Sequence, residues 1–185
     1  MKKQSLLLVL LLAITSTVMA QSKSAFSNGD NLLNVGIGLG TPFFGTGYSA
    51  SLPVNPTISF EHGFSDEISV GAQVSYASYK FNDTYQGQTY YSFKYNATYV
   101  GVRGSYHLGE MLELDSKFDV YGGGSLGYVV LSASDSEGYS GTLGSAVGYG
   151  VFGGGKYFFS HNAGIYAEVG YQSLSYLNVG LALKF

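Results

Sequence analysis

After residue 30, the sequence alternates between apolar side chains and small or polar ones with a period of two. Such alternation is typical of β-strands whose two faces meet different environments, whereas an amphipathic helix repeats about every 3.6 residues. In the last segment, for example, the apolar side chains from Leu177 to Phe185 alternate with Asn178, Gly180, Ala182 and Lys184. The pattern predicts eight strands, near residues 33–40, 54–62, 68–80, 93–107, 118–132, 145–159, 163–172 and 176–185.

The connections between these strands alternate in length. Tight turns are predicted at 64–67 and 160–162 and a somewhat longer link at 109–117, whereas polar loops are predicted at 41–52, 81–92 and 133–144, with a brief one at 173–175. Short turns at one end and longer loops at the other are typical of membrane barrels with both termini on the periplasmic side. The predicted fold class is therefore all-β, an eight-stranded antiparallel up-and-down transmembrane β-barrel preceded by a cleavable signal peptide.

The charged residues decide which face of the strands meets lipid. They make up 11% of the chain, against about a quarter in an average protein. Within the strands they share the face that also carries Gly, Ser, Asn and Gln, and the opposite face has no charge in mid-strand. A lipid-facing Lys or Arg at mid-membrane would cost about 2–4 kcal/mol. A membrane barrel with a polar interior is thus favoured over a soluble, ligand-carrying barrel with an apolar interior.

The first twenty residues have the features of a secretory signal. Lys2 and Lys3 precede an apolar run at 6–14, and small residues lead to a cleavage site between Ala20 and Gln21. A retained N-terminal anchor is the alternative interpretation. The predicted organisation is a signal peptide at 1–20, a short periplasmic segment at 21–31 and the barrel domain at 32–185.

The charged residues on the interior face predict a paired network. Three acids match three bases, and Arg103, the only Arg, has a planar guanidinium that suits bidentate pairing with a carboxylate. Arg103 and Glu168 lie at similar depth near the middle of their strands, so we expect them to form the centre of a plug. The predicted network consists of Arg103, Glu168, Glu61, Lys156, Asp119 and Lys184. A gated ion path through this plug is the functional alternative.

The sequence offers little for catalysis, metal or cofactor binding. His62, His107 and His161 all map to the short-turn end, without loop-side Ser or Asp partners, and are interpreted as solvated or turn residues. The chain has no Cys, and no His/Asp/Glu cluster has metal-ligand spacing. Nine Lys and Arg against twelve Asp and Glu argue against nucleic acid as a partner. No catalytic, metal or cofactor site is therefore predicted, and the chain is expected not to be an enzyme.

Several motifs resemble the small eight-stranded outer-membrane β-barrel family, the OmpA transmembrane domain and OmpX type, in the form common among Bacteroidetes. They are GVRGSYH at 101–107, DVYGGG at 119–124, AEVGY at 167–171 and LNVGLALKF at 177–185. The terminal Phe185, with Leu183 and Leu181, resembles the signal read by the outer-membrane assembly machinery. The resemblance implies an outer-membrane location, contact with membrane lipid and lipopolysaccharide, and a monomeric barrel.

The family's roles include stabilisers, adhesins and small pores, so the expected function is a structural, envelope-integrity role or a surface-interaction role. The strands at 93–107, 118–132 and 145–159 exceed the 9–11 residues that a tilted span needs. They are expected to project beyond the membrane, where an exposed edge or the extracellular loops could bind a surface protein. The alternatives are a narrow porin-like pore and, more distantly, an enzyme that modifies lipid A in the outer leaflet.

Overall fold

The computed structural model describes residues 24–41, 49–85, 88–135 and 139–185. The predicted signal peptide and its cleavage site at Ala20 and Gln21 lie outside these ranges. Within them, no helix is long and apolar enough to cross a membrane.

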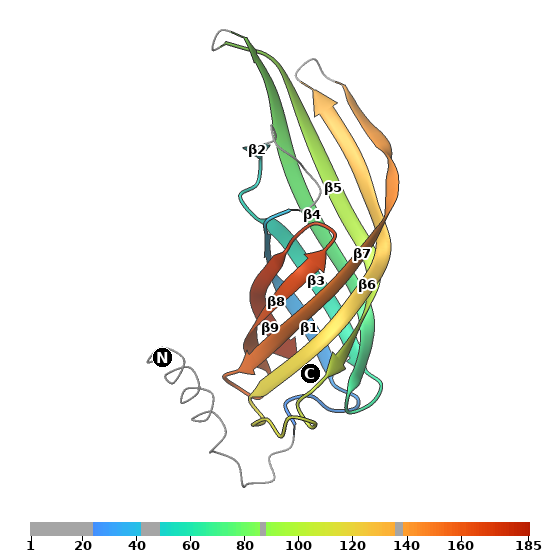
Figure 1. The fold of residues 1–185 in the computed structure, drawn as a ribbon, viewed down its shortest axis with the longest axis vertical. Helices are drawn as coiled ribbons and strands as arrows, with labels where there is room; N and C mark the ends of the chain where they lie inside the picture. The colour runs from blue at the N-terminus through green and yellow to red at the C-terminus, as the bar shows by residue number, and fades with distance from the viewer. Residues whose placement is uncertain (1–23, 42–48, 86–87, 136–138) are drawn as a thin grey trace, which may run out of the picture.

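Eight strands form a closed ring, in which each strand pairs antiparallel with the next and β9 returns to β1 (Figure 1). A two-residue strand, β2 (Ser49–Ala50), adds to the edge of β4. The predicted fold class, an eight-stranded antiparallel up-and-down barrel, is confirmed. The ring strands are β1 (Asn31–Leu39), β3 (Asn55–Gly63), β4 (Ile68–Tyr85), β5 (Gln88–His107), β6 (Phe118–Asp135), β7 (Ser140–Phe158), β8 (Ala163–Gln172) and β9 (Leu177–Lys184).

The alternating pattern places apolar side chains outside the ring and polar ones in the lumen. Val102 is 62% exposed on the outer wall, while its neighbour Arg103 is 3% exposed inside. Val151 and Leu181 also lie on the outer wall, and Glu168 is buried in the lumen. Adjacent residues of a strand point to opposite faces. Once one residue of a strand is known to face the lumen, the direction of every other side chain in that strand follows. This arrangement is the inverse of a soluble carrier barrel.

Four neighbouring strands are about twice as long as the other four. Strands β4 to β7 have 18 to 20 residues, whereas β1, β3, β8 and β9 have 8 to 10. They extend beyond the barrel as one curved sheet (Figure 1). The predicted loops at 81–92 and 133–144 were therefore wrong. Most of 81–92 belongs to strands, because β4 continues to Tyr85 and β5 begins at Gln88. Most of 133–144 does so too, because β6 reaches Asp135 and β7 begins at Ser140. Polar composition indicated loops, but backbone pairing between neighbouring strands keeps these residues extended.

Apolar side chains close the lumen at both ends. At the short-turn end, the segment 24–30 runs across the opening, and Phe26 packs in a buried cluster with Leu32, Phe158 and Tyr166. At the long-strand end, the β8–β9 turn places Leu174 inside, against Tyr99 and Val129 among others. Neither closure follows from strand periodicity, since both come from segments outside the strands.

Candidate functional site

Arg103 occupies the centre of the lumen and contacts four other strands. From β5, its Nη2 lies 2.7 Å from Oε1 of Glu168 on β8, and its Nε lies 3.0 Å from Oε1 of Glu61 on β3. Its Nη1 donates to Oε1 of Gln73 on β4 at 3.3 Å. The guanidinium also lies 4.3 Å from the ring centre of Phe152 on β7. One side chain thus connects strands from both sides of the ring.

The two carboxylates beside Arg103 have further donors. Oε2 of Glu61 accepts hydrogen bonds from the hydroxyls of Ser105 at 2.6 Å and Ser69 at 2.9 Å. Oε1 of Glu168 accepts one from the hydroxyl of Tyr121 at 2.9 Å. Buried charges are tolerated when they are paired and hydrogen-bonded. Both carboxylates are paired with Arg103 and accept further hydrogen bonds, while Nε of Arg103 and Oε1 of Glu61 contact each other as an ion pair without a hydrogen bond.

His107 extends the network toward the short-turn end. Its Nε2 lies 2.9 Å from Oγ of Ser69, and its Nδ1 lies 2.8 Å from Oδ1 of Asp119. Its ring stacks on Phe26 with centroids 3.6 Å apart. The interpretation of His107 as a solvated or turn residue was therefore wrong: it is buried, because its position in β5 points into the lumen and Phe26 covers it. His161 is exposed in its turn, and His62 is half-buried beside Asn31.

Ser69, His107 and Asp119 lie in the order of a hydrolase triad, but their hydrogen bonds differ from those of a nucleophile site. The Ser69 hydroxyl donates to Glu61, so His107 does not receive its proton. All three side chains are buried, and Phe26 stacks on the His107 ring. Both ring nitrogens of His107 face oxygen atoms, Oγ of Ser69 and Oδ1 of Asp119. The arrangement holds strands together and does not activate the serine.

The two predicted lysines occupy different places. Lys156 of β7 lies in the lumen, 3.4 Å from Oδ2 of Asp119 and 3.5 Å from the ring centre of Tyr121. Lys184 of β9 lies apart, where its Nζ donates to the carbonyl of Ala25 at 2.7 Å and lies 3.7 Å from Oδ2 of Asp30. The structure thus brings together five of the six predicted charges and places Lys184 with the segment 24–30.

Sequence reasoning missed several members of the network, namely His107, Ser69, Ser105, Gln73 and Tyr121. All five occupy lumen-facing positions of their strands, so strand alternation was the signal that could have found them. Among the residues that the structure describes, no group of three His, Cys, Asp or Glu could hold a metal ion.

The three C-terminal residues Leu181, Leu183 and Phe185 lie on the outer wall. The Phe185 backbone exchanges two hydrogen bonds with Asn31 of β1, with N–O distances of 2.8 and 3.0 Å. The end of the chain thus contributes to the seam that closes the ring.

Comparisons with known proteins agree with this architecture. No protein-family model matches the chain. No curated protein matches it either. Among solved structures, Ail, the attachment invasion locus protein of Yersinia pestis, crystallised with the heparin analogue sucrose octasulfate, is 14% identical, with a TM-score of 0.51 over 85% of this chain and 96% of Ail.

Two structures from Pseudomonas aeruginosa are similar to the same degree. The N-terminal β-barrel domain of OprF is 13% identical, with a TM-score of 0.51 over 86% of this chain and 99% of that domain. The outer membrane protein OprG is 13% identical, with a TM-score of 0.52 over 88% of this chain and 99% of its own. This chain therefore has the fold of small eight-stranded outer-membrane β-barrels, and the resemblance noted in the sequence is confirmed for the fold.

Proposed function

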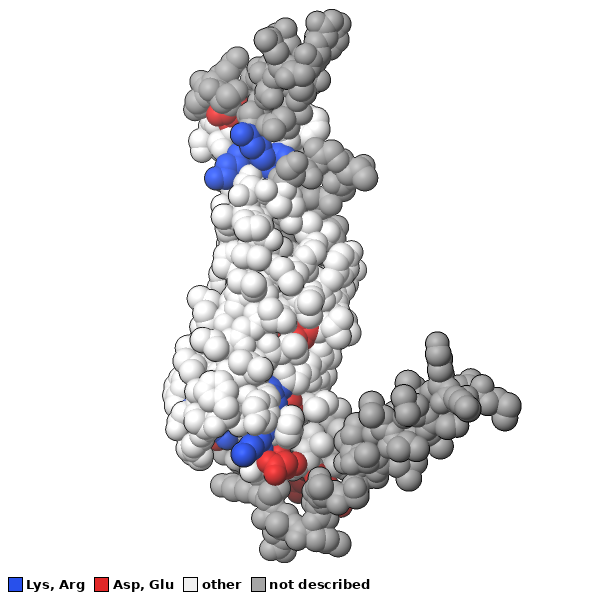
Figure 2. Space-filling model, turned by 90° about the vertical axis from the view of Figure 1, so that its left-hand side faces the viewer, with Lys and Arg blue, Asp and Glu red and all other residues white. Residues whose placement is uncertain are grey.

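We propose that this chain is a non-enzymatic outer-membrane protein whose closed barrel anchors a projecting sheet for contact with a surface partner. Residues 1–20 would direct export, and both termini would lie in the periplasm. The outer wall supports a membrane location, because aromatic side chains occupy both of its ends: Phe64, Tyr106, Phe118 and Phe159 at the short-turn end, and Tyr128, Tyr149 and Tyr171 at the other. Figure 2 shows a wall almost without charged atoms between these ends.

The observation that carries the surface role is the extension of β4 to β7 beyond the other four strands. A tilted span needs about 9–11 residues. β1, β3 and β8 have this length and β9 is one residue shorter, whereas β4 to β7 exceed it. On β7, pairing with β8 begins only at Gly150, so 140–148 have no strand on that side within the described residues. This stretch contains no charged residue and no Pro, the usual protections of a free edge. An extended segment of a partner could pair with it.

Shortening the two hairpins tests this role. We would replace 80–94 and 130–145 each by Asn-Gly, joining the paired positions Tyr79 and Tyr95, and Val129 and Ala146, so that most of the free edge of β7 is removed. The expected result is a barrel that still shows heat-modifiable gel migration, on cells that lose adhesion or protein binding. Adhesion equal to that of wild-type cells would contradict the surface role. If the shortened protein then corrected the permeability defect of a strain that lacks this protein, an envelope-integrity role would be favoured.

A pore is the second candidate, and the filled lumen weighs against it. Leu174 closes one end, Phe26 closes the other, and the Arg103 network fills the middle. We expect purified protein in planar bilayers to show no steady conductance. Steady openings in wild-type protein, absent from protein with Arg103 replaced, would instead place an ion path through the network.

A further inference from the structure

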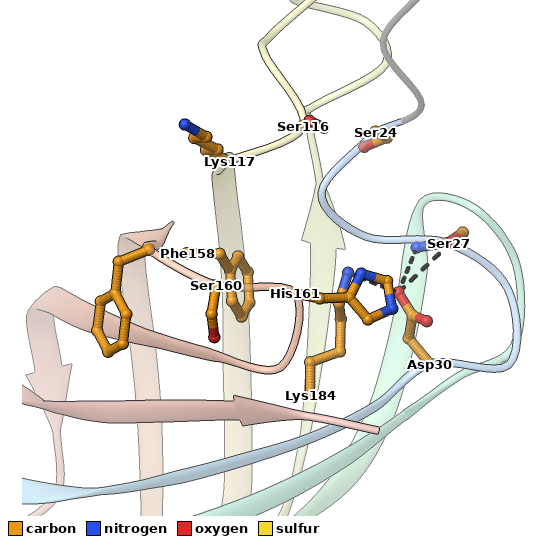
Figure 3. A pocket seen from close by; sticks show the side chains of 10 residues that line it. Ser24, Ser27, Asp30, Ser116, Lys117, Phe158, Ser160, His161 and Lys184 are labelled. Atoms are coloured by element: carbon orange, nitrogen blue, oxygen red, sulfur yellow. Dashed lines mark hydrogen bonds and ion pairs between the residues drawn. The ribbon is translucent and has the colours of Figure 1, made fainter.

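A cavity of about 510 Å³ lies at the short-turn end, between the segment 24–30, the β5–β6 connection, the β7–β8 turn and the end of β9 (Figure 3). This volume falls within the range of small-molecule sites, about 300–1,000 Å³. Asp30, Lys117, His161 and Lys184 supply its charged or titratable groups, and serines from three of these segments add hydroxyls.

The lining has an excess of donors. Among the described residues that line it, Asp30 is the one carboxylate, and Oδ2 of Asp30 already accepts from the backbone N of Ser27 at 3.0 Å and lies 3.7 Å from Nζ of Lys184. Lys184 is itself held by the carbonyl of Ala25. By contrast, the side chains of Lys117 and His161 are exposed and have no hydrogen-bond or ion-pair partner among the described residues. Ammonium, imidazole and hydroxyl donors together suit an anion with several oxygen atoms, such as phosphate.

The outer wall beside this cavity is aromatic. Phe159, which lines the cavity, and Phe118, which follows Lys117, are both exposed on the wall. Phe118 packs against Tyr157 with ring centroids 5.0 Å apart. Aromatic side chains at the ends of a membrane barrel mark the level of lipid headgroups. If the wall lies in a bilayer, as the proposed function requires, the cavity lies at headgroup level.

The geometry points to a binding site for the phosphate of an anionic membrane phospholipid, with Lys117 and His161 as its free donors. Lys184 and Asp30 frame the site by fixing the segment 24–30, and the exposed Phe159 supplies an apolar wall toward the glycerol and acyl chains. This inference rests on the proposed membrane location of the barrel and adds a ligand at the end opposite the projecting sheet.

The absence of Trp from the chain allows a direct test. Phe159→Trp places a single tryptophan beside the cavity, and its fluorescence can be excited apart from that of the tyrosines. The protein is reconstituted in vesicles containing brominated phosphatidylglycerol or brominated phosphatidylcholine as quencher. We expect the anionic lipid to quench with an apparent affinity about fivefold higher, because each Lys near anionic lipid contributes about 1 kcal/mol. In the Phe159→Trp protein, the further substitutions Lys117→Gln and His161→Gln should bring the ratio of the two apparent affinities close to one. Lys80→Gln with Lys94→Gln, at the other end of the barrel, should leave it unchanged.

Three outcomes would overturn the site. Equal quenching by the two lipids in the Phe159→Trp protein would show that the cavity has no preference for anionic lipid. If the Lys117/His161 variant kept the preference, the lipid would bind at another place on the protein. Loss of the preference when inorganic phosphate is added would assign the cavity to a free anion and not to a lipid. Failure of the proposed membrane location would look different, because neither brominated lipid would then quench the tryptophan.

Discussion

Replacing Arg103 with Met is expected to lower the free energy of unfolding by about 3–5 kcal/mol, because it leaves buried carboxylates without their partner. Arg103 is the cation within ion-pair distance of both Glu61 and Glu168. Met replaces the first part of the Arg side chain with an unbranched apolar chain, so the substitution removes the guanidinium charge and its hydrogen bonds. Denaturant unfolding of the barrel in lipid vesicles, followed by gel migration and by circular dichroism, measures this change in the free energy of unfolding.

Two further variants separate charge pairing from packing. Lys94→Met removes an exposed lysine of the same strand and should change stability by a few tenths of a kcal/mol, as exposed charges do. Adding Glu61→Gln and Glu168→Gln to Arg103→Met removes the unpaired charges and should recover much of the loss. If Arg103→Met alone is as stable as wild type, or if the triple variant is the least stable, the lumen is not held by this network.

Placing Arg on the outer wall at Val102 should cost about 2–4 kcal/mol when the protein is folded in a bilayer, since a charge there must leave water. Val102 lies on β5 between Tyr106 at the short-turn end and the projecting part of the strand, and its side chain is exposed on the wall. Folding efficiency into vesicles and denaturant unfolding provide the measurement.

Thr142→Arg is the matched control, because Thr142 is exposed on the part of β7 that projects beyond the barrel. It should be nearly neutral. Equal effects of the two Arg substitutions would mean that the wall around Val102 is not in lipid, and the membrane location would fail with it.

The sequence by itself determined the strands and the direction of their side chains. Val102 and Arg103 are adjacent, and a period of two sends one outward and the other inward whatever their neighbours are. For the same reason, alternation placed Glu61, Asp119, Lys156 and Glu168 in the lumen before any contact was known. The lengths of β4 to β7 were underestimated. Where these strands project beyond the apolar outer wall, neither of their faces has to be apolar, so apolar and polar residues no longer alternate clearly.

Only the tertiary structure decided which interior groups meet. The contacts of Arg103 with Glu61 and Glu168 depend on the stagger between strands far apart in sequence, and a pattern within one strand carries no information about that stagger. His107 is buried because Phe26 from the N-terminal segment stacks on it, and Lys184 contacts that same segment instead of the lumen acids. Side-chain direction is a local property of extended backbone, whereas these contacts exist only once the ring has closed.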